Sequence, residues 1–412
     1  MAGQYKYLKK IKVKTQNLHL GMYISELDKA WSESAFLFQG FPIETEEDLQ
    51  AVRNECEWVY VDFPTREDYH VYLMTISNAK IKSNHVPLRP KNELSYELPK
   101  ANNHYKNSTT MVKTIMHDIM HDEDFELAPV KQAVEDCIDS ILSNQDALLL
   151  LSNIKNADEY TAEHCLRVAI MAIAFGKYLG LSQDELGYIG VGAMLHDVGK
   201  MRIPNEILNK PGKLTREEYR IMQKHSEEGY KILQQKPLLS KIAIDIAYSH
   251  HERIDGKGYP RKLDSSQISY FTKIVSIIDT YDAITSERVY SAAKAPAVAF
   301  KILQENTSAQ FDEELTYKFV EWMGIYPVGS LVEMRTGEVG IVTKVYPEQK
   351  LKPRVLLVTD EEKCSGYEKV VNLSKMAVHS NGELYQIKKV HPNGAFGIQL
   401  DKYVKEGLVL QH

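Results

Sequence analysis

Hydrophobic residues recur along the chain in three different patterns. Up to about residue 70, short β-branched or aromatic runs alternate with turn signals, as at 11–13 and 58–61, which is typical of strands. From about residue 110 to 322, apolar residues recur at three- and four-residue intervals, which is typical of helices. Farther on, short Val, Ile and Leu runs bounded by glycine return, as at 337–346. The chain therefore alternates from strands to helices and back to strands.

These patterns set the expected domain boundaries. The predicted fold class is multidomain, with a small β-rich (α+β) N-terminal domain, a central all-α domain and a small β C-terminal appendage. The expected ranges are 1–74 for the N-terminal domain, 75–110 for a polar linker, 111–325 for a body of about eight helices and 326–412 for the appendage. One helix is expected in the first domain, beginning near Thr45, an N-cap residue followed by three acidic residues.

Composition and charge narrow the class of protein. With 43% hydrophobic and 26% charged residues among 412, the chain is typical of a globular protein and not of a disordered one. A net charge of −6 gives no global basic field, so DNA and membrane surfaces are not expected partners. Apolar stretches fall far below the roughly 20 residues of a membrane span, and no secretory signal is visible. Four scattered cysteines fit free thiols in a reducing compartment, so the expected location is cytoplasmic.

Candidate metal ligands gather in the predicted helical body. Five of the 14 histidines fall within 88 residues, and two aspartates accompany them: His164, His196, Asp197, His225, His250, His251 and Asp279. Asp279 lies inside an apolar run, where a carboxylate normally pairs with a cation or coordinates a metal. Seven nitrogen and oxygen ligands are too many for one tetrahedral zinc. They suit two first-row metals such as iron or manganese, bridged by one carboxylate.

A lysine accompanies this ligand set. Lys200 follows His196 by four residues, so a helical turn would direct both side chains to the same side. A cation beside two metals implies an anionic substrate. Two metals can hold a hydroxide and neutralise the attacking and leaving oxygens of an in-line phosphoryl displacement, while Lys200 stabilises a non-bridging oxygen. These residues predict phosphodiester hydrolysis.

The ligands form an ordered motif. His164 is followed by the string HDVGK at 196–200, then by His225, by HHERIDGKGYP at 250–260, and by Asp279. This order resembles the signature of HD-GYP domains, a branch of the HD metallophosphohydrolases. The resemblance implies a bacterial cyclic-dinucleotide phosphodiesterase that acts mainly on cyclic di-GMP and holds an iron or manganese cluster.

The resemblance also implies roles for individual residues. The first metal would be held by His164, His196, Asp197 and Asp279, and the second by His225, His250 and His251. Asp197 would bridge the two metals, and Lys200 would contact the scissile phosphate. Tyr259 of the GYP string and Arg288 match positions that contact the base or the phosphates of the dinucleotide.

Two positions depart from the family pattern within the matched stretch, which runs from about Tyr160 to Tyr290. Some members bind a third metal through a glutamate four residues before the first histidine. That position is Tyr160 here, so two metals are expected. A basic residue found in some members is replaced by Ser291, with Lys294 nearby. These departures leave open the choice between cyclic di-GMP and the hybrid cyclic GMP-AMP, and between a linear dinucleotide and mononucleotides as products.

The first 70 residues resemble an uncharacterised β-rich domain that often precedes HD-GYP. The similarity lies in the segments at 20–24, 27–31, 38–41 and 59–62. It implies a sensory domain with a signalling partner, but it does not identify the signal. Tandem helices ahead of His164 are compatible with a homodimer.

Two other functional hypotheses remain open. A non-catalytic receptor could bind the dinucleotide and report it through the β-rich domain, although the complete ligand set argues against this. An HD nucleotidohydrolase acting on mononucleotides or alarmones would need neither the histidine pair at 250–251 nor the GYP string. Two further His-Asp pairs, at 117–118 and 121–122, lack a downstream Gly-Lys and are expected to be solvated helix residues.

Overall fold

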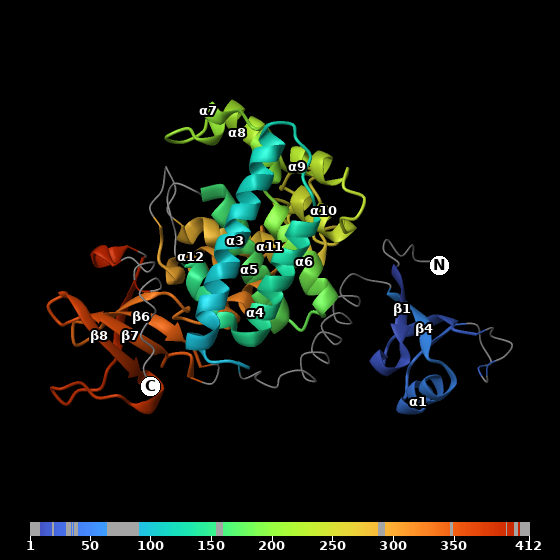
Figure 1. The fold of residues 1–412 in the computed structure, drawn as a ribbon. Coiled ribbons are helices and arrows are strands. Elements are labelled where there is room, and N and C mark those ends of the chain that lie inside the picture. The colour runs from blue at the N-terminus through green and yellow to red at the C-terminus, as the bar shows by residue number, and fades with distance from the viewer. Residues whose placement is uncertain are drawn as a thin grey trace. The chain divides into compact units, whose positions relative to one another are not determined.

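The computed structural model describes the greater part of the chain. The described residues are 9–18, 20–29, 34, 36, 40–63, 90–153, 160–286, 293–346, 349–392, 394–398 and 403. The chain divides into two compact units, residues 1–86 and 87–412. Strands come first, helices follow, and strands return at the end (Figure 1), which confirms the predicted multidomain fold class.

The first unit contains a small antiparallel sheet. Among the described residues its strand order is β1-β4-β2-β3, with β1 Lys9–Lys14, β2 Tyr23–Leu27, β3 Phe41–Pro42 and β4 Trp58–Phe63. Helix α1 Glu46–Glu55 begins after Thr45, whose hydroxyl accepts a hydrogen bond from the Asp48 amide while the Asp48 carboxylate accepts one from the Thr45 amide. The predicted start of this helix is confirmed. Val52 of α1 is buried together with Val59 and Val61 of β4.

The second unit is built on helices. Their bounds are α3 Leu94–Met120, α4 Ala128–Ser152, α5 Tyr160–Tyr178, α6 Gln183–Leu195, α7 Asn205–Leu208, α8 Arg216–Gln223, α9 His225–Leu233, α10 Lys241–Ser249, α11 Tyr270–Thr285, α12 Pro296–Glu305 and α13 Glu313–Met323. The described residues hold more helices than the eight expected, because the stretch 205–249 is divided into four short ones. Within this same described part, no helix is both long and apolar enough to cross a membrane.

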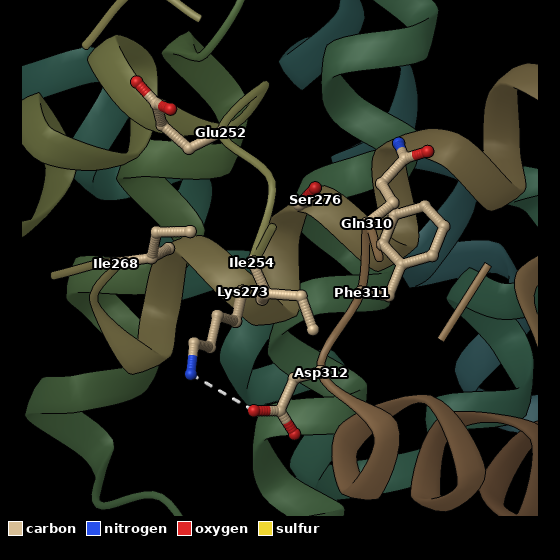
Figure 2. Close-up of a pocket in the computed structure, with 8 residues that line it drawn as sticks. All are labelled: Glu252, Ile254, Ile268, Lys273, Ser276, Gln310, Phe311 and Asp312. Carbon is tan, nitrogen blue, oxygen red and sulfur yellow. Dashed lines mark hydrogen bonds and ion pairs between the residues drawn. The ribbon is translucent and has the colours of Figure 1, made fainter. Parts of the chain in front are cut away.

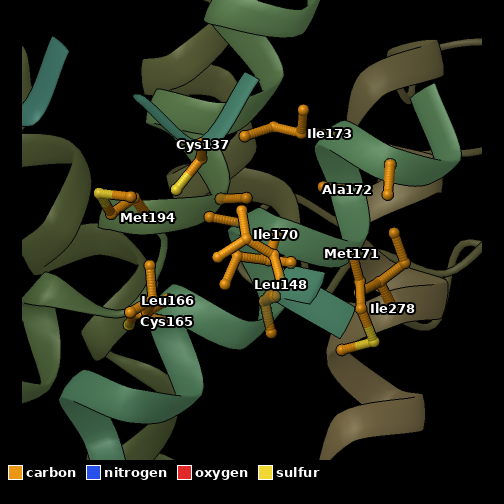
Figure 3. Close-up of a cluster of buried hydrophobic side chains, with 14 of the residues drawn as sticks. Cys137, Leu148, Cys165, Leu166, Ile170, Met171, Ala172, Ile173, Met194 and Ile278 are labelled. Atoms are coloured by element: carbon orange, nitrogen blue, oxygen red, sulfur yellow. The ribbon is translucent and has the colours of Figure 1, made fainter. Parts of the chain in front are cut away.

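Helix α5 is the centre of the helical body. It contacts α3, α4, α6, α11 and α13, and its side chains are buried almost without interruption from residue 162 to 176. Figure 3 shows Leu166 and Ile170 of α5 among Leu148 of α4, Met194 of α6 and Ile278 of α11. Because α5 is surrounded on all sides, a polar side chain on it must find its partners inside the protein.

The prediction of a linker is wrong for residues 94–110, because these residues form the first part of α3. The buried face of this part carries Leu98, Ala101 and Tyr105 at three- and four-residue intervals, but the polar side chains of Ser108 and Thr109 continue that face, so the apolar pattern is short. Glu97 is also buried, where it accepts hydrogen bonds from Ser140 and Ser143 of α4 at 2.8 and 2.6 Å. Residues 75–89 of the expected linker lie outside the described residues.

The C-terminal strands form an antiparallel sheet. In the described part of the chain its order is β8-β7-β6-β5-β9, with β5 Leu331–Met334, β6 Val339–Lys344, β7 Arg354–Thr359, β8 Ser365–Asn372 and β9 Ile387–His391. Alternate residues of β6 face opposite ways: Ile341 joins the helical core, and Val342 joins a separate core on the other side of the sheet. The predicted appendage therefore packs against the helices within one compact unit.

Gly199 marks a close backbone approach between the 3-10 helix η4 Val198–Arg202 and α9. A Cβ atom at this position would lie 2.0 Å from the His225 carbonyl oxygen and 2.4 Å from the Gly229 nitrogen. We expect Gly199→Ala to lower the free energy of unfolding by about 1–3 kcal/mol, because overpacking forces the backbone apart. Scanning calorimetry should show the melting temperature falling by several degrees.

Gly187→Ala on α6 is the matched control, because a Cβ atom there meets open space. Removing a helical glycine should leave the free energy of unfolding unchanged or raise it by up to about 1 kcal/mol, so the melting temperature should not fall. Equal melting temperatures for the two variants would contradict the close approach at Gly199.

Candidate metal centre

Three of the five clustered histidines lie at helix ends. His196 follows α6, His225 begins α9 directly after α8, and His250 follows α10. Carbonyl groups in the last turn of a helix have no helical partner. The imidazole Nδ1 atom of each histidine lies close to such a carbonyl oxygen. The distance is 2.7 Å from His196 to Ala193, 2.7 Å from His225 to Met222 and 3.0 Å from His250 to Ala247. Since a carbonyl only accepts, Nδ1 carries the proton and the Nε2 lone pair is left for a ligand.

The remaining members come from different settings. His164 lies inside α5 and Asp279 inside α11, and these two helices pack against each other. The His164 Nε2 atom is 3.0 Å from Asp279 Oδ1. His251 follows His250, and its ring centroid is 5.0 Å from that of His225. The fold thus brings together side chains that lie up to 115 residues apart in the sequence.

Asp197 lies between two groups of ligands. Its Oδ2 atom is 3.6 Å from His164 Nε2 and 3.4 Å from His196 Nε2, whereas its Oδ1 atom is 3.4 Å from His225 Nε2 and 3.7 Å from His250 Nε2. The ligand atoms within each group are close enough to share an ion: His164, His196 and Asp279 in one group, and His225, His250 and His251 in the other, each within 4.8 Å. One carboxylate therefore faces both groups, with one oxygen toward each.

Burial and charge set the ionisation of these groups. Burial lowers the pKa of His225 to about 4 and that of His251 to about 3, so both imidazoles are neutral near pH 7. Burial alone would raise the pKa of the Asp197 carboxyl, but the nearby Lys200 ammonium and His196 hold it well below its usual value. Asp197 is thus a charged carboxylate and His225 and His251 are neutral imidazoles, which is the form in which each of these groups binds a metal. Burial alone would lower the pKa of His196, but the neighbouring Asp197 carboxylate raises it.

The donor atoms fit divalent transition metals. His196 Nε2 and Asp197 Oδ1 are both buried, and neither has a hydrogen-bond partner among the described residues. Buried polar atoms without a partner are costly, and a metal ion would satisfy both. Imidazole nitrogen together with carboxylate oxygen is a donor set that suits iron, manganese or zinc.

Two predicted substrate residues border this cluster, and a third falls outside the described residues. The Lys200 Nζ atom is 2.5 Å from Asp197 Oδ2. The ring of Tyr259 stacks on that of His251, with centroids 4.7 Å apart and planes inclined by 29°. Arg288 lies in the part of the chain that is not described. The structure therefore places Lys200 beside Asp197 and Tyr259 beside His251.

The loop that carries Tyr259 is fixed on both sides. The buried Glu252 carboxylate accepts hydrogen bonds from the amides of Arg261 and Leu263, at 2.6 and 3.0 Å. On the other side, the Ile254 amide donates to the Gln310 carbonyl at 3.3 Å. A small pocket lies beneath this junction (Figure 2), and its eight lining residues include none of the seven clustered ligands. The pocket is thus distinct from the metal centre.

The sequence did not single out three buried residues near His164. Asp282 and Arg167 lie behind its ring, and Cys165 lies within 4.8 Å of ligand atoms of His196 and Asp197. Asp282 and Arg167 each follow a clustered ligand, Asp279 or His164, by three residues, which is the spacing of one helical turn. That spacing is the one signal that could have identified them.

The two other His-Asp pairs lie at the end of α3. The His117 side chain is 66% exposed, and His121 is exposed as well. Their ring centroids are 4.1 Å apart. The prediction of solvated residues therefore holds for His117, His121 and Asp122, whereas Asp118 is only 22% exposed and the second pair follows the end of α3 instead of lying within it.

Comparison with known proteins connects this centre to a family. Residues 144–315 match the HD domain, and residues 9–130 match a domain of unknown function, DUF3391. The cyclic di-GMP phosphodiesterase PA4108 of Pseudomonas aeruginosa is 33% identical over 354 residues, which cover 84% of each chain. The 3'3'-cGAMP-specific phosphodiesterase 2 of Vibrio cholerae is 42% identical over 146 residues, covering 34% of this chain and 28% of that protein.

Among solved structures, Bd1817, an HDG"Y"P protein from Bdellovibrio bacteriovorus, aligns with a TM-score of 0.47 and 19% identity, covering 76% of this chain and 98% of that one. The relation to the Pseudomonas protein spans both the DUF3391 and the HD regions. The chain belongs to the family of HD-domain cyclic-dinucleotide phosphodiesterases.

Proposed function

We propose that this chain hydrolyses cyclic di-GMP to a linear dinucleotide at a centre of two divalent metal ions. The observation that carries the proposal is the position of Asp197, whose two oxygens face two separate groups of ligands. The choice of substrate is supported by the Pseudomonas relative, which is named for cyclic di-GMP and matches over most of both chains. The cyclic GMP-AMP relative matches a smaller share of each chain.

In this proposal each ligand group holds one metal. His164, His196 and Asp279 would hold the first, and the three histidines at 225, 250 and 251 would hold the second, with Asp197 between them. Iron and manganese are the proposed metals because both accept imidazole and carboxylate ligands and leave positions for water. Metals bound in this way supply Lewis acidity and lower the pKa of water, which provides a nucleophile near neutral pH.

Two side chains of the centre are proposed to contact the substrate. The Lys200 ammonium lies beside Asp197 and would stabilise negative charge on a non-bridging phosphate oxygen. Tyr259 would border the bound dinucleotide, since its ring is held against His251 by a loop fixed through Glu252. Arg288 is proposed as a further contact on sequence grounds alone.

Replacing the central carboxylate tests the two-metal arrangement. We expect Asp197→Asn to bind fewer metal ions than the wild type, which should hold about two per chain, because an amide is a poor bridging ligand. Inductively coupled plasma mass spectrometry after loading with Mn²⁺ and desalting measures the ratio. Asp118→Asn is the matched control, since Asp118 belongs to one of the two other His-Asp pairs, at the end of α3. The same metal content in all three proteins would contradict the arrangement.

Substrate and catalysis can be tested together by chromatography of reaction products. Manganese-loaded wild type should convert cyclic di-GMP faster than cyclic GMP-AMP. Lys200→Ala should retain its metals and lose about 100- to 1,000-fold in kcat, the usual effect of removing one group that stabilises transition-state charge. Lys231→Ala is the control, because this α9 lysine is 57% exposed and pairs with Glu228.

Three outcomes would separate the hypotheses. Faster turnover of cyclic GMP-AMP would show that this dinucleotide, and not cyclic di-GMP, is the preferred substrate. The enzyme class would stay the same. Binding of either dinucleotide without turnover by the metal-loaded protein would favour a receptor. Full activity of Lys200→Ala would show that Lys200 is not needed for catalysis.

A further inference from the structure

The imidazole of His164 is oriented differently from those at the helix ends. His164 lies inside α5, where backbone carbonyls are already bonded to amides of the next turn. No orphan carbonyl is therefore at hand to accept from its Nδ1. This nitrogen instead lies 2.7 Å from the Oδ2 atom of Asp282, a side chain on α11 that is 2% exposed.

Helix α11 thus approaches His164 with two carboxylates. Asp279 lies 3.0 Å from Nε2, and Asp282, one turn later, lies 2.7 Å from Nδ1. The two aspartates hold opposite edges of the same ring. A carboxylate that accepts from Nδ1–H fixes the tautomer, restricts rotation of the ring and makes Nε2 a stronger donor to a metal.

Asp282 is itself held by Arg167 of α5, one turn after His164. The guanidinium donates from Nε to Asp282 Oδ1 and from Nη2 to Asp282 Oδ2, both at 2.9 Å. This two-point contact fixes the plane of the carboxylate. Arg167 is 2% exposed and also reaches Glu163 at 3.5 Å and Ser286 at 3.3 Å, so its charge is compensated inside the protein.

We propose that the buried Arg167–Asp282 pair is a positioning device for the metal centre, which sets the ring orientation and tautomer of His164. Asp282 acts on His164 directly, and Arg167 acts by holding Asp282. Neither side chain touches substrate in this role. The inference rests on the proposed function, because it takes His164 as a metal ligand.

The test measures metal affinity of the full-length, metal-stripped chain, using Mn²⁺ alone as the probe and a competing chelating dye as the readout. Asp282→Asn should lower Mn²⁺ affinity by about 10- to 100-fold, the usual cost of losing a carboxylate behind a metal-binding histidine. Melting temperature is recorded for every variant, because a merely structural pair would change stability without changing the affinity of the folded protein.

Asp245→Asn is the matched control. Asp245 on α10 accepts from Arg261 at 2.6 Å, from Thr272 at 3.0 Å and from Ser249 at 3.1 Å, so it also pairs with an arginine in the same body. Within the described part of the chain, no hydrogen bond joins its side chain to a clustered histidine. Its Mn²⁺ affinity should equal that of the wild type. If Asp282→Asn shares that wild-type affinity, the inference is overturned.

Two further variants keep the result unambiguous. His164→Gln should weaken Mn²⁺ binding; if it does not, the metal assignment itself fails, and the inference fails with it. If Asp282→Asn does not fold, Arg167→Lys decides, because lysine keeps the charge but cannot make the two-point contact. Weaker Mn²⁺ binding by folded Arg167→Lys would support the inference, and wild-type affinity would overturn it.

Discussion

The structure depends on the burial of one charged carboxylate, that of Asp197. The residue is 1% exposed, and an ion taken out of water at this depth needs several compensating partners. The chain supplies Lys200 and the imidazoles of four histidines within 4 Å. Each of these must be brought from a different element to the same point. The elements α5, α6, α9, α10 and η4, or the residues next to their ends, supply these groups.

Helix ends orient three of the histidines that surround Asp197. A helix terminus presents a carbonyl that orients an imidazole, so His196, His225 and His250 need no special partner beyond the end of a helix. Two of the short helices between residues 205 and 249, α8 and α10, end where such a ligand is fixed. His164 lies within α5 instead, and there the buried Asp282 takes the place of the carbonyl while Arg167 holds Asp282.

The sequence was sufficient for features that depend on local order. The seven clustered ligands form an ordered motif, Thr45 begins a helix, and alternating apolar runs become strands. It was insufficient where burial depends on packing between distant segments. Residues 94–110 bury small and polar side chains against α4 and so resemble a linker, and Asp282 acquires its role only because α11 lies beside α5. The pattern of apolar residues in one segment does not show which other segment will pack against it.

The most direct test of the account is a crystal structure of the metal-loaded protein with anomalous scattering measured at the manganese or iron edge. The account predicts two peaks about 3.5–4 Å apart, the usual spacing of a two-metal site. One should lie on the Oδ2 side of Asp197, beside His164, and the other on the Oδ1 side, beside His225. A single peak, or two peaks that both lie away from Asp197, would contradict the bridging role on which the proposed chemistry depends.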